Sequence, residues 1–185
     1  MKKTIVGIFA VFSAVIPVQI LAGYADDRSE IENLSNKYMV AVDSGDIETV
    51  MSTWADDGEL IWVFGHEHGK DAIRKAMSGF GGGRYEEIPE GATSRLRTRH
   101  QIINHVIDVE GDTATTTAYW FAMTNRNPGE ELKLLYFGHY EDVLERIDGE
   151  WKFKVRKIFN EGRDNKELWY PELGEIDPRT RKPPQ

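Results

Sequence analysis

The second half of this chain has a residue pattern that is typical of a sheet built from consecutive hairpins. Four runs are rich in Val, Ile, Thr and aromatic residues, as strands are: 98–109, 113–124, 132–147 and 151–159. Short segments containing Gly, Asp, Asn or Pro join the runs, at 110–112, 127–130 and 148–150. Such segments favour hairpin turns. The pattern therefore predicts a four-stranded antiparallel meander.

The first half has helical spacing instead. From Asp27, apolar residues recur every three or four positions: Ile31, Leu34, Tyr38 and Val42. A Ser-Gly-Asp turn ends this helix, and Asp46 is a suitable N-cap for a short second helix that reaches Trp54. A lone strand at 59–64 and a third helix at about 70–80 follow.

These elements predict an α+β domain over residues 26–159. A chain of 185 residues suits one domain with a tail, here 160–185 with its four prolines. We expect a strongly curved, mostly antiparallel sheet, closed by three N-terminal helices around a pocket. Two segments could cover the pocket mouth: the loop 81–97, which begins with three glycines, and the apolar cluster 168–171 in the tail.

The N-terminal segment resembles a secretory signal. Two lysines precede a run without charge at 4–22, and small residues allow cleavage after Ala22 or Ala25. We expect a secreted or periplasmic protein without stable membrane insertion after cleavage. The alternative is a retained anchor, but Pro17 and Gln19 interrupt a run that is already marginal against the roughly 20 residues a spanning helix needs.

Composition removes several classes of function. Acidic residues outnumber basic ones by 31 to 23, which disfavours a nucleic-acid partner. The chain has no cysteine, so disulfides, thiolate metal sites and cysteine nucleophiles are excluded. His66 and His68 could share a cation, but a good site needs further ligands, and a polar turn is the simpler interpretation. We expect no metal and no cofactor.

Three short motifs resemble one known group of proteins. Asp43-Ser-Gly-Asp46 ends the first helix, His100-Gln-Ile-Ile-Asn104 opens a strand, and Ile-Asp-Gly-Glu-Trp-Lys-Phe-Lys-Val-Arg156 ends the sheet. Together with the order of elements over 27–159, they resemble the SnoaL-like branch of the NTF2-like superfamily. Within it, the chain is most similar to the group of scytalone dehydratase and hexachlorocyclohexane dehydrochlorinase.

The resemblance implies a set of site residues. Asp43 and His100 match the Asp–His pair of that group, and Arg156 and Asn104 match an Arg and an Asn of the dehydrochlorinase pattern. The second His of scytalone dehydratase is missing here, and its tyrosine pair is matched only by the candidates Tyr38 and Tyr140. The substrate is not implied, because related members include cyclases, isomerases, epoxide hydrolases and noncatalytic adaptors.

The chemistry of this set is proton transfer. A carboxylate such as Asp43 fixes the tautomer of His100 and leaves its second ring nitrogen free as a base, while Arg156 could stabilise developing charge. We expect a cofactor-independent lyase or isomerase acting on a small apolar substrate, for example an aromatic or cyclic one. Its expected substrate contacts are Tyr38, Trp54, Trp62, Asn104 and Tyr140.

Less specific interpretations remain open. His100 could be a core histidine, and Arg156 could belong to a basic strand edge that faces solvent or a second subunit. The whole domain could be a noncatalytic module that binds a small hydrophobic molecule or oligomerises. If alternation is regular, one sheet face carries His100, Ile102, Asn104 and Val106. The opposite face would then carry Ile103, His105, Ile107 and Trp120. We expect a homodimer or homotrimer that assembles through that face.

Overall fold

The computed structural model describes residues 17–78, 97–126 and 129–162, which form three helices and six strands. Their order is α1 (Pro17–Ser44), α2 (Ile47–Ser52), β1 (Trp54–Trp62), β2 (Gly65–His68), α3 (Lys70–Met77), β3 (Thr98–Glu110), β4 (Thr113–Thr124), β5 (Lys133–Ile147) and β6 (Glu150–Asn160). The predicted α+β class, the three helices and the meander are confirmed. The two segments expected to cover the pocket mouth, 81–97 and 168–171, lie outside the described residues, except for Arg97.

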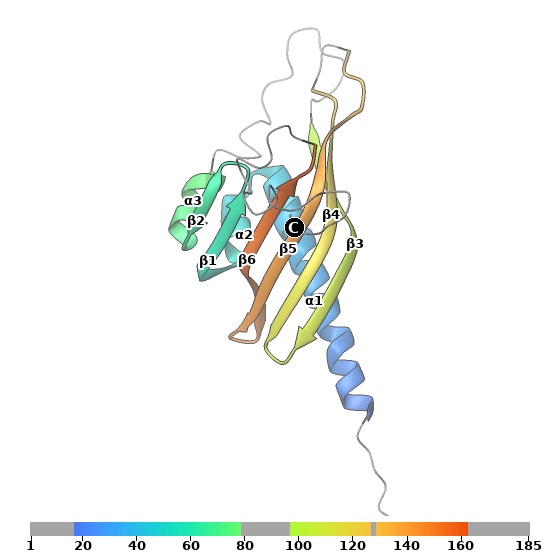
Figure 1. Ribbon diagram of the computed structural model, residues 1–185, viewed down its shortest axis with the longest axis vertical. Coiled ribbons are helices and arrows are strands. Elements are labelled where there is room, and N and C mark those ends of the chain that lie inside the picture. The colour runs from blue at the N-terminus through green and yellow to red at the C-terminus, as the bar shows by residue number, and fades with distance from the viewer. Residues whose placement is uncertain (1–16, 79–96, 127–128, 163–185) are drawn as a thin grey trace, which may run out of the picture.

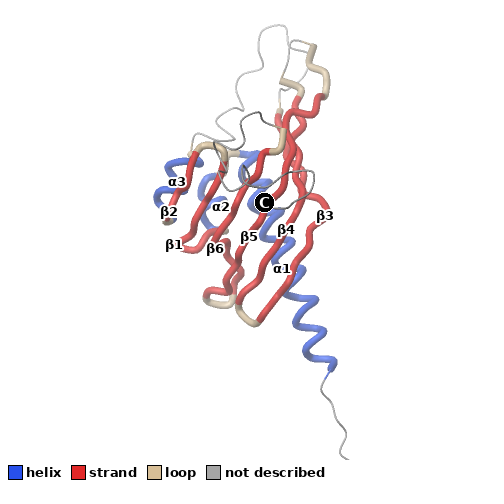
Figure 2. Tube along the Cα trace, in the orientation of Figure 1, coloured by secondary structure: helices blue, strands red, loops and turns tan. Residues whose placement is uncertain are grey.

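The six strands form one curved open sheet in the order β2-β1-β6-β5-β4-β3. All neighbouring strands are antiparallel except β1 and β6, which are parallel. In Figure 1, α1 crosses behind the sheet, and Figure 2 shows the other face without a helix over it. This single-sided cover places the core, and any interior site, between α1 and the sheet.

A strand covers residues 59–62 as predicted, but the prediction that it is a lone strand was wrong. β1 begins at Trp54, two residues after α2 ends at Ser52, and it pairs with β2 through Glu59 and His68. The segment Asp56-Asp57-Gly58 lies inside β1, at an irregularity where the register with β6 shifts. At Gly58 a Cβ would lie 2.9 Å from the Trp54 ring, so the strand bends where only glycine fits.

The regular alternation expected along β3 was also wrong. Ile103 pairs with Tyr119 and Val106 with Thr117, so two residues of β3 oppose Ala118. Asn104, one of these two, has φ 53°. This bulge reverses the faces after Ile103, because an extra residue shifts the two-residue period by one.

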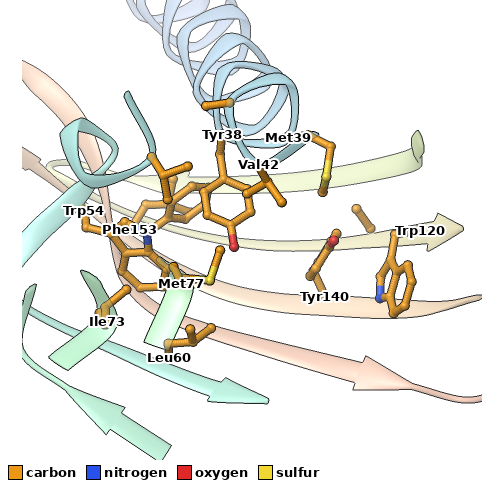
Figure 3. Close-up of a cluster of buried hydrophobic side chains, with 14 of the residues drawn as sticks. Tyr38, Met39, Val42, Trp54, Leu60, Ile73, Met77, Trp120, Tyr140 and Phe153 are labelled. Atoms are coloured by element: carbon orange, nitrogen blue, oxygen red, sulfur yellow. The ribbon is translucent and has the colours of Figure 1, made fainter. Parts of the chain in front are cut away.

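The core contains the helix face that the sequence predicted. Ile31, Tyr38 and Val42 are buried on α1 and pack against the sheet, as Figure 3 shows for the last two. Near its start, α1 is held by Tyr24, whose hydroxyl donates to the carbonyl of Ile107 over 3.1 Å. In the part of the chain that the structure describes, no helix is both long and apolar enough to cross a membrane.

Candidate active site

A cavity of about 130 Å³ lies between α1 and the sheet. Aromatic side chains make up much of its wall, namely Tyr38, Trp62, Phe64, Trp120, Tyr136 and Tyr140. Its volume is close to the roughly 150 Å³ that holds one benzene molecule in a protein interior. His100 and Asn160 add two polar side chains to the wall. The cavity thus suits a ligand of about one ring.

His100 and Asp43 meet at one side of this cavity. The Nδ1 atom of His100 lies 2.7 Å from Oδ1 of Asp43, and the backbone N–H of His100 donates to Oδ2 over 2.9 Å. The carboxylate is 10% exposed and the imidazole 26%. An ionised carboxylate only accepts hydrogen bonds, so Nδ1 carries the proton and Nε2 is left as the basic nitrogen.

The sequence places Asp43 by ending α1 one residue later. Gly45 takes φ 72°, and its N–H donates to the carbonyl of Val42 over 3.2 Å. Asp46 then caps α2 by accepting from the N–H of Thr49 over 3.0 Å, as the sequence predicted. The Gly45 contact ends α1 and the Asp46 cap begins α2, so the turn between the two helices holds the Asp43 carboxylate against the start of β3.

Arg156 does not line the cavity and does not face solvent. Its side chain is 1% exposed and forms a two-point ion pair with Asp142, with Nε to Oδ1 at 2.9 Å and Nη2 to Oδ2 at 2.8 Å. The solvent-facing strand edge is therefore wrong for this residue. Its guanidinium carbon lies 4.4 Å from the ring centre of Tyr38 and 4.5 Å from that of Tyr140. Arg156 supports the wall from behind.

Tyr38 and Tyr140 lie on the cavity wall as expected. Burial raises the pKa of both hydroxyls, that of Tyr140 well above its ordinary value, and the Arg156 guanidinium opposes this rise. Figure 3 shows both side chains in the layer between α1 and the sheet. The two hydroxyls stay protonated near neutral pH and can donate hydrogen bonds to a ligand.

Two residues expected to contact the substrate do not line the cavity, and a third does. Asn104 is exposed on the outer face because of the β3 bulge. Trp54 is 1% exposed in the core behind Tyr38 and does not line the cavity. Trp62 does line it.

Trp120 lies on the cavity wall, so its expected place on the assembly face was wrong. It is 6% exposed, and its ring centre lies 5.9 Å from that of Tyr140 and 6.1 Å from that of His100. Its indole N–H donates to the carbonyl of Phe159 over 3.2 Å. Because Phe159 is on β6 and Trp120 on β4, the indole reaches across β5, which lies between these strands. The small residues on either side of it, Ala118 and Ala122, are also buried and were the available signal.

The SnoaL-like domain family matches residues 23–157 of this chain. The chain belongs to the SnoaL-like family. This family includes polyketide cyclases and dehydratases. A search of curated protein sequences finds no significant match to the chain.

Several solved structures share the fold of this SnoaL-like domain. A protein of unknown function with a cystatin-like fold from Nostoc punctiforme is 25% identical, with a TM-score of 0.60, covering 74% of this chain and 92% of that one. The "Putative Scytalone Dehydratase" from Novosphingobium aromaticivorans is 22% identical, with a TM-score of 0.62 and coverages of 76% and 87%. ActVI-ORFA from Streptomyces coelicolor is 18% identical, with a TM-score of 0.61 and coverages of 75% and 99%. These likenesses show an NTF2-like, cystatin-like fold.

The histidines of β2 lie away from the cavity of the SnoaL-like domain. His66 Nε2 is 2.9 Å from Oε2 of Glu59, and His68 Nδ1 is 3.7 Å from Oε1 of the same carboxylate. Within residues 17–78, 97–126 and 129–162, no group of three or more His, Asp or Glu side chains is arranged to hold a metal ion. The described polar groups on the cavity wall are an imidazole, tyrosine hydroxyls and an amide, which suit proton transfer and hydrogen bonding.

Proposed function

We propose that the protein is a cofactor-independent lyase or isomerase in which Asp43 and His100 act as the base. The observation that carries this proposal is the 2.7 Å contact between the two side chains at the wall of an apolar cavity. A base held in this way contributes about 10²–10⁴-fold to a proton transfer. The substrate is a small, largely apolar compound, because the cavity has room for about one ring.

The geometry supports elimination next to a carbonyl group. Nε2 of His100 takes a proton from the carbon beside the carbonyl, and the electron pair left behind forms the new carbon–carbon double bond. The carbon–oxygen bond at the next carbon breaks, and its hydroxide leaves as water after it receives the proton from the imidazolium. The hydroxyls of Tyr38 and Tyr140 can stabilise the carbonyl oxygen, on which negative charge develops.

Arg156 has an indirect role in this proposal. It lies beside the rings of Tyr38 and Tyr140, and its charge is already paired with Asp142. We assign it the role of a positioning residue that holds the two tyrosines, instead of the direct stabilisation of substrate charge that the resemblance implied.

The test is the dehydration of β-hydroxycyclohexanone to cyclohexenone, followed by the ultraviolet absorbance of the product. The wild-type protein should accelerate this reaction, whereas His100→Gln and Asp43→Asn should each lose at least about 10²-fold in rate. His66→Gln changes an exposed histidine of β2 in the same way and should leave the rate unchanged. Equal rates in all four proteins would contradict the enzyme proposal and leave the noncatalytic binding domain as the better account.

We also propose that the protein is exported through a signal within the first 25 residues. The contact of Tyr24 with Ile107 favours cleavage after Ala22, since cleavage after Ala25 would remove this hydrogen bond. The mass of the protein recovered from a periplasmic or culture fraction tests this. A full-length chain found only in the cytoplasm would contradict it.

A further inference from the structure

The last residue of β6 lines the cavity and carries a buried polar atom without a hydrogen-bond partner among the described residues. Asn160 is 9% exposed and lines the cavity. Its Oδ1 atom is buried and accepts no hydrogen bond from the described residues. A buried amide oxygen without a donor is unfavourable in the free protein, and such groups in native structures require an explanation.

The position of Asn160 in the sheet relates it to the proposed base. Four inward-facing residues lie in one row across the strands, in the order Ile102, Trp120, Gly138 and Asn160. His100 begins the adjacent row on β3. Three strand spacings separate the backbones of β3 and β6, or roughly 14 Å in total. After the two side chains are allowed for, this distance leaves space for a single substituted ring between them.

The Trp120 indole fills the floor between these two polar groups. Its N–H is bonded to the carbonyl of Phe159, the residue before Asn160, so the indole edge lies next to the amide. A flat ligand that stacks on this indole would have one edge toward His100 and the other toward Asn160. Aromatic contacts of this kind favour a ring over an aliphatic chain.

We infer that Asn160 is a specificity-determining residue, whose Oδ1 accepts a hydrogen bond from a hydroxyl group on an aromatic or cyclic ligand in this cavity. The inference rests on the proposed function in taking the cavity as the substrate site, and it adds the class of substrate. An acceptor selects a donor group, and a hydroxyl is the smallest neutral donor that a cavity of about 130 Å³ can admit with a ring. A ligand that lacks the hydroxyl leaves the amide oxygen unsatisfied, which is the usual origin of strong discrimination.

Phenol and toluene test this inference, because they differ only by a hydroxyl in place of a methyl group. Their dissociation constants are measured by isothermal titration with the wild type, Asn160→Leu and a control, Asn33→Leu, which makes the same change on an exposed position of α1. The quantity compared is the Kd of toluene divided by the Kd of phenol. Because each ratio is compared with that of the wild type, the greater hydrophobicity of toluene cancels.

The ratio should fall about tenfold in Asn160→Leu, as expected for one neutral hydrogen bond, and remain unchanged in Asn33→Leu. Asn160→Ser, which keeps an acceptor in a smaller side chain, should retain part of the preference and serves if the leucine variant does not fold. A ratio that changes less than twofold in both Asn160 variants, while both ligands bind, would overturn the role of Asn160. It would leave the Asp43–His100 base untouched, since that is tested by dehydration.

If neither phenol nor toluene binds to the wild type at millimolar concentration, the assignment of a hydroxylated ring as the ligand is overturned. The dehydration rates of the wild type and His100→Gln then decide the proposed function separately. If toluene and phenol bind and only the phenol affinity responds to Asn160, both the site and its specificity are supported.

Discussion

Replacing Gly138 with alanine should be among the most damaging small changes in this protein. Gly138 lies on β5 between Trp120 of β4 and Asn160 of β6. A Cβ at this position would lie 1.8 Å from the carbonyl oxygen of Phe159, far inside any real contact. Backbone cannot yield as a flexible side chain does, so β6 must move away from β5.

The size of the effect follows from two contributions. Overpacking a tight site costs about 1–3 kcal/mol. Moving the Phe159 carbonyl also breaks its 3.2 Å bond to the Trp120 indole, and a buried donor left alone costs about 1–3 kcal/mol more. The free energy of unfolding should therefore fall by roughly 4 kcal/mol, or about 8–16 °C in Tm for a chain of this size.

Thermal unfolding by circular dichroism measures this effect, with Gly111→Ala as the control. Gly111 has φ 62° with open space where its Cβ would be, so alanine there costs only the strain of a left-handed backbone, about 1–2 kcal/mol. If Gly138→Ala melts within about 3 °C of Gly111→Ala, the close approach of β5 and β6 is not the constraint described here.

Three further predictions concern buried charge, pH and assembly. Arg156→Met should lower the free energy of unfolding, measured in urea, by roughly 3–5 kcal/mol, because Asp142 then keeps a buried charge without its partner. Adding Asp142→Leu should restore part of this loss, and a double variant as unstable as the single one would contradict the prediction. Burial lowers the pKa of His105, against the raising effect of Asp142, so the unfolded state binds more protons and stability is lost as the pH falls below the unfolded value of about 6.5. His105→Gln should reduce this loss between pH 7 and pH 5 in urea titrations, and an identical loss in both proteins would refute it. Light scattering should show a dimer or trimer for the wild type and a monomer for the double variant Tyr119→Glu with Phe137→Glu. Both rings are about half exposed on the outer face of the sheet, where an apolar contact between subunits would bury them. A wild-type monomer at micromolar concentration would contradict this prediction.

Local patterns in the sequence predicted most of the elements. The helical spacing of α1, the cap at Asp46 and the hairpin turns each depend on residues within a few positions of one another. The proximity of Asp43 and His100 came from the resemblance to a family, because residues 57 positions apart leave no local signal. The periodicity alone did not reveal the pair.

The missed features depend on pairing between distant strands. The β3 bulge at Asn104 shifts the faces of every later residue on that strand, and nothing in the alternation of apolar residues marks where it begins. It removed Asn104 from the cavity and turned Ile107 inward, to 2% exposure. The predicted assembly face therefore loses His105 and Ile107 and keeps Ile103. Trp120 is absent from that face for a different reason, because it pairs with the inward-facing Ile102 ahead of the bulge.

Arg156 shows the same difficulty for charge. Among Lys152, Lys154 and Lys157 it has the composition of a solvated strand edge, but register places it opposite Asp142 on β5. Sequence position does not show which charge of such a run faces inward and finds a partner.

In the proposed reaction, Asp43 holds His100 with its proton on Nδ1, so that Nε2 is the base. Nitrogen-15 chemical shifts of the imidazole, recorded near neutral pH, report this tautomer directly. The wild type should show a protonated Nδ1 and an unprotonated Nε2 for His100, and Asp43→Asn should lose this preference, since the amide can donate as well as accept. A His100 signal with the proton on Nε2 in the wild type, unchanged in Asp43→Asn, would contradict the role of Asp43 and His100 as the base.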